Sequence, residues 1–131
     1  MKDLANCLVV GMGGFVGAIV RFVLGRWAAQ KWGADFPYGT LLINVSGSFV
    51  LGLFASLSTR LAWNDSMRLL IAIGFLGAFT TFSTFAFETF ELVRQASLIR
   101  AAANVIGSFA LGLLAVYLGV VVSRLLLRQP A

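Results

Sequence analysis

A run of phenylalanines and hydroxyl side chains stands in an otherwise apolar part of the sequence, residues 74–85 (Gly-Phe-Leu-Gly-Ala-Phe-Thr-Thr-Phe-Ser-Thr-Phe). Phe82 and Phe85 are three residues apart and would share one face of a helix, with Ser83 and Thr84 between them. Hydroxyl groups donate hydrogen bonds, and the edge of an aromatic ring carries partial positive charge. Together these groups could contact an ion. The alternative is that the phenylalanines face lipid or pack against other helices.

The same run predicts a break in a helix. Glycine weakens a helix interior, and the β-branched pair Thr80-Thr81 adds strain. We therefore expect the break within residues 77–81. Non-helical backbone at membrane depth must be buried in protein or line a polar cavity. A break also frees carbonyl groups that can hold a cation, as the discontinuous helices of transporters do.

The composition indicates that this run lies in a membrane. The chain has 131 residues, of which 60% are hydrophobic and 11% are charged. Soluble domains are roughly half apolar and about a quarter charged. A core of this size cannot hide the excess, because small domains leave much of their surface exposed. Lipid is the solvent that such a surface requires.

Four apolar stretches are long enough to cross a bilayer, which takes about 20 residues per helix. They cover residues 4–27, 38–57, 69–93 and 101–123. The three tryptophans lie near the ends of these stretches, as interfacial aromatic residues do. We predict an all-α membrane protein of four transmembrane helices, the third broken near its middle, in one domain over residues 1–131. The short connections should make consecutive helices antiparallel.

The scarcity of reactive side chains excludes several functions. The sequence has no histidine and a single cysteine, Cys7. An imidazole or thiolate metal site and an internal disulfide are therefore excluded within one chain. The chain also offers no nucleophile beside a base, so we do not expect an enzyme. The formal charge of +5 does not indicate nucleic-acid binding, because the cations stand singly at the ends of apolar stretches.

The basic residues are distributed almost evenly over the two sides of the predicted bundle. One side carries Lys2, Arg60, Arg68, Arg124 and Arg128; the other carries Arg26, Lys31, Arg94 and Arg100, with Arg21 inside the first stretch. Excess Lys and Arg on one side normally sets orientation, and here there is almost none. We hypothesise that the chain inserts in both orientations and works as an antiparallel dimer.

Two segments sixty positions apart resemble each other. Residues 44–53 (Asn-Val-Ser-Gly-Ser-Phe-Val-Leu-Gly-Leu) recur as residues 104–113 (Asn-Val-Ile-Gly-Ser-Phe-Ala-Leu-Gly-Leu). A duplicated two-helix unit would explain the match. The alternative, that membrane helices draw on few residue types, stays open.

Two motifs carry a resemblance to a known family. Residues 74–85, followed by Glu88-Thr89, strongly resemble the signature of the Fluc (CrcB) fluoride-channel family, as do residues 39–44 (Gly-Thr-Leu-Leu-Ile-Asn). The resemblance covers essentially the whole chain. It implies a dual-topology homodimer in a bacterial inner membrane, with two pores that export fluoride down its gradient.

The resemblance also implies roles for particular residues. The rings of Phe82 and Phe85 would line the pore, and Asn44 would offer an amide donor from the second helix. The carbonyls of Gly77 and Thr80, from both subunits, would hold a structural Na⁺ on the dimer axis. Arg21 would lie at a wet vestibule, where it can raise the local anion concentration.

Other polar residues are weaker candidates. A hydroxyl track along the pore would consist of Thr40, Ser83, Thr84 and Ser108, although such residues often join helices by hydrogen bonds. Glu88 lies one turn beyond Phe85, and an intramembrane acid is a functional candidate. The alternative is that Glu88 pairs with a nearby cation or hydroxyl.

Two other classes of protein are alternatives to a channel. A small cation or drug exporter would need an acid in the first helix, where this sequence has Arg21 and no acid after Asp3. A purely structural subunit would not explain a broken helix with paired phenylalanines. An anion channel fits both the arginine in the first helix and the broken third helix with its paired phenylalanines.

Overall fold

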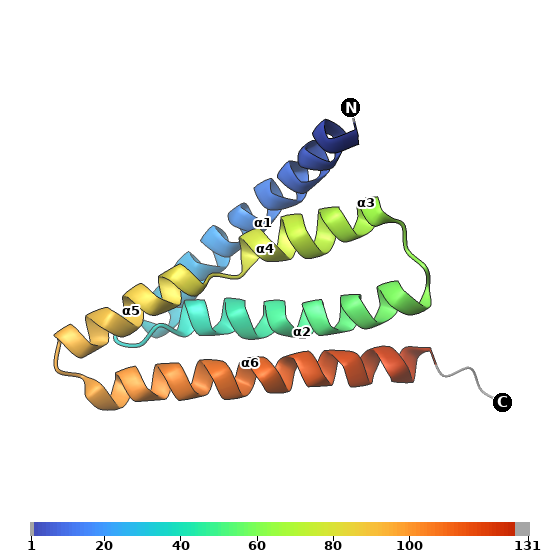
Figure 1. The fold of residues 1–131 in the computed structure, drawn as a ribbon. Coiled ribbons are helices and arrows are strands. Elements are labelled where there is room, and N and C mark those ends of the chain that lie inside the picture. The colour runs from blue at the N-terminus through green and yellow to red at the C-terminus, as the bar shows by residue number, and fades with distance from the viewer. Residues whose placement is uncertain (1, 128–131) are drawn as a thin grey trace.

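The computed structural model describes residues 2–127 and is all-helical over that range (Figure 1). Its elements are α1 (Lys2–Trp32), α2 (Tyr38–Arg60), α3 (Asp65–Arg68), η1 (Leu69–Leu76), α4 (Gly77–Phe79), α5 (Phe82–Arg94) and α6 (Leu98–Leu126). The elements from α3 to α5 form one interrupted span, Asp65–Arg94. With α1, α2 and α6 it makes four spans that are long and apolar enough to cross a membrane. The four predicted spans are confirmed. Arg128, which was counted in the comparison of basic residues on the two sides, lies outside the described residues.

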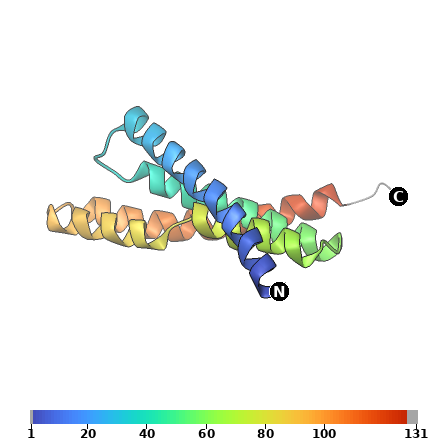
Figure 2. The same cartoon turned by 90° about the horizontal axis from the view of Figure 1, so that it is seen from above.

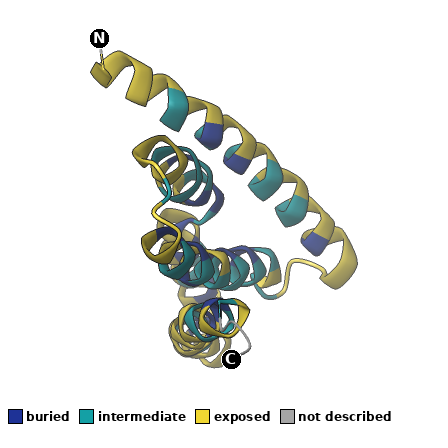
Figure 3. Cartoon of the chain, turned by 90° about the vertical axis from the view of Figure 1, so that its right-hand side faces the viewer, coloured by how far each residue is buried: buried dark blue, intermediate teal, exposed yellow. Residues whose placement is uncertain are grey.

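Successive spans run in opposite directions, as their short connections require (Figure 1). The most extensive packing nevertheless joins spans that are not consecutive, since α2 packs along α6 and α1 packs against η1. From above, α1 crosses the other helices at a steep angle (Figure 2). Its buried positions, Gly13, Gly17 and Ala28, lie on the side that faces the bundle, and the rest of α1 is largely exposed (Figure 3).

Glycines allow the close approach of α2 and α6. A Cβ on Gly52 would overlap the carbonyl oxygen of Val116, and one on Gly119 would overlap that of Phe49. Small residues of this kind let helix backbones touch in lipid, where no hydrophobic force drives association. This contact makes α2 and α6 a fixed pair against which the broken span lies.

The third span breaks at two residues. Thr80 (φ −79°, ψ 155°) and Thr81 (φ −150°, ψ 118°) have extended backbone between α4 and α5. The break falls within the predicted residues 77–81. The preceding η1 is a π-helix, which the sequence did not lead us to expect. Buried Leu76 and Phe79 pack with Ile43 of α2 into a small apolar core beside the break.

Candidate functional site

Asn44 of α2 holds the break through two hydrogen bonds. Its Nδ2 donates to the carbonyl oxygen of Thr81 at 3.0 Å, and the N–H of Thr81 donates to its Oδ1 at 2.8 Å. The Asn44 amide thus gives the N–H of Thr81 the partner that the carbonyl of Gly77 would supply in a continuous helix, and it also donates to the Thr81 carbonyl. A primary amide has two N–H groups, so Asn44 keeps a second donor besides the one bound to Thr81.

The hydroxyl groups after the break gather around Thr81. Its Oγ1 accepts from the N–H of Thr84 at 3.2 Å and so caps the start of α5. The same oxygen lies 3.0 Å from Oγ1 of Thr84 and 3.3 Å from Oγ of Ser83. The structure therefore brings two of the predicted hydroxyl residues together. Thr81 is the buried centre of the cluster, although the sequence interpretation gave its side chain no role.

The two phenylalanines of the motif differ in burial. Phe82 is 73% exposed and Phe85 only 8% exposed, although their ring centroids are 5.7 Å apart. The Phe85 ring meets Phe109 of α6 in an edge-to-face arrangement, with centroids 6.4 Å apart and planes at 79°. Phe85 is thus fixed within the chain, while Phe82 projects from it. The sequence gave no specific signal for Phe109.

A buried polar relay connects α6 to the backbone of Phe85. Asn104 is 1% exposed, and its Nδ2 donates to Oγ1 of Thr89 at 2.8 Å. The hydroxyl of Thr89 donates in turn to the carbonyl oxygen of Phe85 at 2.7 Å. Ser108, a predicted pore residue, lies at the edge of this relay, with Oγ 3.5 Å from Oδ1 of Asn104. We missed Asn104, although its equivalence to Asn44 in the two similar segments was a usable signal.

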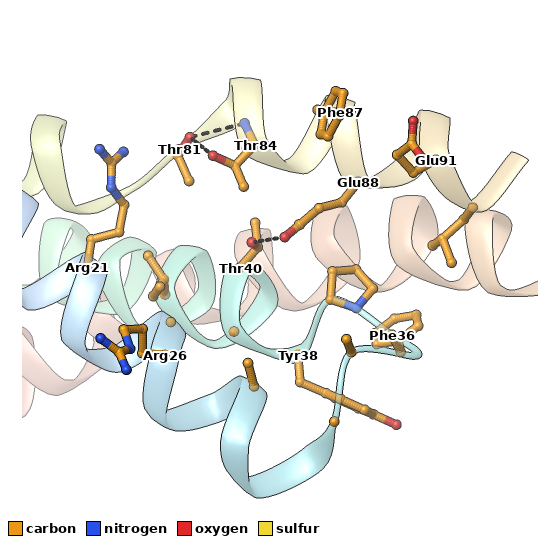
Figure 4. A pocket seen from close by; sticks show the side chains of 18 of the residues that line it. Arg21, Arg26, Phe36, Tyr38, Thr40, Thr81, Thr84, Phe87, Glu88 and Glu91 are labelled. Carbon is orange, nitrogen blue, oxygen red and sulfur yellow. Dashed lines mark hydrogen bonds between the residues drawn. The ribbon is translucent and has the colours of Figure 1, made fainter. Parts of the chain in front are cut away.

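A cavity of about 550 Å³ opens on one side of the break (Figure 4). Arg21 and Arg26 of α1 line one wall, and Glu88 of α5 lies on the other. Thr40 of α2 donates to Oε1 of Glu88 at 2.9 Å, which is the hydroxyl pairing considered for this acid. The cavity thus brings together four predicted residues, Arg21, Thr40, Thr84 and Glu88. Arg26 was not predicted to belong to it.

A second cavity, of about 320 Å³, lies on the other side of the break. Among its lining residues are four that the sequence singled out, namely Asn44, Gly77, Thr80 and Phe82. Thr81 lines both cavities. Thr81 of the extended pair therefore borders both hollows, whereas Asn44 and Thr80 line the second cavity alone and Thr84 the first alone. Ser83, Phe85 and Ser108 line neither cavity.

The break frees the two carbonyls that were predicted to hold a cation. In a continuous α-helix, the carbonyl of Gly77 would accept from the N–H of Thr81, and that of Thr80 from the N–H of Thr84. These two donors instead bind Asn44 Oδ1 and Thr81 Oγ1. Free carbonyls at a helix break suit a hard cation such as Na⁺. The residues present therefore fit the ion. Within residues 2–127, no cluster of three acidic, cysteine or histidine side chains offers another metal site.

These features define a multi-pass membrane protein with a broken third span and uncharged polar groups that line two cavities at the break. The family described as "CrcB-like protein, Camphor Resistance (CrcB)" matches residues 8–120. The chain belongs to this family.

Curated relatives agree with the family assignment. A protein of Roseiflexus sp. (strain RS-1), named "Fluoride-specific ion channel FluC", is 49% identical over 122 residues, which cover 92% of this chain and 98% of that protein. A protein of the same name from Trichormus variabilis is 42% identical over 90% of this chain and 88% of its own length. "Fluoride-specific ion channel FluC 1" of Methanosarcina acetivorans is 42% identical, with 86% of each chain covered.

Proposed function

We propose that this protein is a fluoride-specific ion channel that exports fluoride passively and so protects the cell from fluoride toxicity. The observation that carries the proposal is the break at Thr80-Thr81, around which uncharged polar groups line two cavities that share Thr81. The choice of fluoride as the ion rests on the names of the relatives. The function is passive transport, and no side chain is assigned a chemical step.

The chemistry of the break suits a small, strongly hydrated anion. Removing water from an ion in a low-dielectric medium costs on the order of tens of kcal/mol, and the pore must return part of that without trapping the ion. The hydroxyl of Thr84, which accepts from Thr81 and keeps its own hydrogen, can face an anion without carrying a full charge. The second N–H of Asn44 and the ring edges of Phe82 and Phe85 can do the same. The helix α5 begins directly after the break, and its positive end favours an anion there.

The charged residues Arg21, Arg26 and Glu88 line the larger cavity, through which an anion would reach the break. Arg21 and Arg26 line the larger cavity and raise the concentration of anions beside it. Glu88 is held by Thr40 on the opposite wall, where it limits how strongly the cavity retains an anion.

The working form that we propose is an antiparallel homodimer with two pores, inserted in both orientations in a bacterial inner membrane. Exposed Phe82 and the second cavity lie on a surface that the chain itself leaves uncovered, and a second copy would complete it. The even distribution of Lys and Arg supports insertion both ways. In the dimer, the carbonyls of Gly77 and Thr80 from both copies would coordinate the structural Na⁺.

Fluoride efflux from liposomes that contain only this protein tests the function, with a fluoride-selective electrode as the readout. We expect rapid efflux of fluoride and retention of chloride in matched vesicles. Vesicles that stay impermeable to fluoride, or that release chloride equally fast, would refute the proposal.

A further inference from the structure

The span that leads into the break is wound in an unusual way. The eight residues of η1 form a π-helix, which ends directly before α4 and the break. A π-helix bonds each residue to the one five positions away, is rare, and often occurs at functional sites. Something must hold this segment in the less common form.

Backbone contacts with α1 lie along the whole of η1. A Cβ on Gly13 would overlap the carbonyl oxygen of Leu70, and one on Gly17 would overlap that of Phe75. In the reverse direction, a Cβ on Gly74 would lie 2.6 Å from the carbonyl oxygen of Val10. The two helices therefore touch through backbone atoms, and at these positions only glycine fits.

The spacing on the two helices does not match. Gly13 and Gly17 are four residues apart, about 6 Å along an α-helix. The carbonyls that they contact belong to Leu70 and Phe75, which are five residues apart. An α-helix aligns carbonyls four positions apart, whereas a π-helix aligns those five positions apart. The π-helical form is therefore the one in which both carbonyls of η1 can meet the two glycines of α1.

We propose that Gly13 and Gly17 are positioning residues for the break. By fixing the carbonyls of Leu70 and Phe75, they set the rotation with which the third span reaches Thr80. A shift of one residue in the register between α1 and η1 would rotate the part of the third span that follows η1 by about 100° about the helix axis. The carbonyls of Gly77 and Thr80 and the ring of Phe82 would then point elsewhere. The flux experiment below rests on the proposed channel function, whereas the labelling experiment does not.

Four single substitutions on α1 test the proposal by fluoride flux. Gly13→Ala and Gly17→Ala should each lower the flux by about tenfold or more. Gly11→Ala and Gly14→Ala are matched controls, because a Cβ at Gly11 meets nothing within 4 Å and one at Gly14 comes no closer than 3.8 Å. The controls should stay within about twofold of the unaltered flux. Equal flux in all four variants would overturn the proposal.

Thiol labelling measures the rotation itself. In a Cys7→Ser background, single cysteines are placed in turn at residues 82–87 and labelled with a water-soluble reagent in membranes. Gly13→Ala should displace the pattern of labelled positions by about one residue, whereas Gly11→Ala should not. An unchanged pattern in Gly13→Ala would refute the positioning role. If the unaltered protein conducts no fluoride, the proposed channel function fails. The labelling experiment still tests whether Gly13 and Gly17 position the break.

Deletion of Ile73 tests the proposal without altering α1. Ile73 is exposed and lies between the two contacting carbonyls. Its removal brings them to the four-residue spacing of an α-helix, so both can still meet the glycines. We expect flux and labelling pattern to remain close to those of the unaltered protein. Loss of either would overturn the proposal, even if Gly13→Ala cannot be purified as a folded protein.

Discussion

Asn44 of α2 pairs with both backbone groups of Thr81, through hydrogen bonds of 3.0 and 2.8 Å. The amide satisfies the N–H of Thr81, which the break separates from its helical acceptor in the middle of a membrane span, where an unsatisfied group costs several kcal/mol. The break is therefore maintained by a side chain from another helix rather than by local backbone strain alone. One residue links α2, the extended segment and the second cavity.

Asn44→Asp should impair fluoride conduction. The substitution removes the donor to the Thr81 carbonyl, which costs about 1–3 kcal/mol of stability, and it places a negative charge beside the anion path. Flux from liposomes and the thermal unfolding midpoint are the measurements. Ser46→Ala is the matched control on α2, since the Ser46 hydroxyl binds only carbonyls of its own helix, at 2.7 and 3.2 Å. Unchanged passage in Asn44→Asp would mean that conduction does not depend on this amide.

Phe82→Ile and Phe85→Ile should both reduce fluoride flux, because each loses the polarised ring edge. Their effects on stability should differ. Within one chain, exposed Phe82 can be replaced at little cost, whereas buried Phe85 also loses its contact with Phe109, about 1 kcal/mol. Phe90→Ile, at an exposed position on the same helix, serves as the control.

Flux and unfolding measured on the same purified variants separate the two roles. Both phenylalanine variants should run as the same assembled species as the unaltered protein. Normal flux in both would refute their assignment to the pore.

The sequence predicted those features that depend on local chemistry. Apolar length specified the four spans, and Gly77 with Thr80-Thr81 located the break. It did not predict that Asn44 binds the backbone of Thr81, because that contact depends on how α2 lies against the third span. The π-helical form of η1 was missed for a similar reason. It arises from contact with Gly13 and Gly17, which precede η1 by more than fifty positions.

Burial also could not be assigned from residue type. Two phenylalanines three residues apart looked equivalent in the sequence, yet α6 covers Phe85 and leaves Phe82 open. Asn104 was assigned no role from the sequence, although it is almost completely buried and donates to Thr89 of α5. Such differences follow from how the helices lie against one another, which depends on close glycine contacts such as those of Gly13, Gly52 and Gly119.

Asn104→Leu should destabilise the protein and lower flux. The substitution leaves the hydroxyl of Thr89 without its donor and puts an apolar side chain of similar shape where Asn104 is enclosed among polar partners. A loss of about 1–3 kcal/mol is expected, with a shift of Phe85 because Thr89 binds its carbonyl. Thermal unfolding in detergent measures the loss of stability, and fluoride flux from liposomes measures the loss of conduction.

Thr59→Val is the control for the Asn104 experiment, because Thr59 is exposed and its hydroxyl binds only carbonyls of its own helix. It should change neither stability nor flux. An Asn104→Leu variant with unaltered stability would show that the relay contributes nothing.

Reporter fusions should place the C-terminus on both sides of the membrane. Lys and Arg are nearly balanced across the predicted spans, so neither orientation is favoured. A pair of reporters, one active in the cytoplasm and one outside it, should therefore both give signal from the same fusion site. Adding two lysines at the described C-terminal end of α6 should bias the ratio, which serves as the positive control. A C-terminus found on one side in every molecule would contradict dual insertion.

Prolonged removal of Na⁺ should inactivate the channel slowly. The proposed ligands are the carbonyls of Gly77 and Thr80, whose helical donors are occupied by Asn44 and by the Thr81 hydroxyl. Without the ion these carbonyls would face one another unpaired between two copies, which disfavours the assembled dimer. The measurement is fluoride flux after increasing times in Na⁺-free buffer, followed by return of Na⁺. A divalent-metal chelator should have no effect, since within the described part of the chain no carboxylate cluster could bind such a metal. Fluoride flux that persists without Na⁺ would contradict the proposal that the carbonyls of Gly77 and Thr80 coordinate a structural Na⁺.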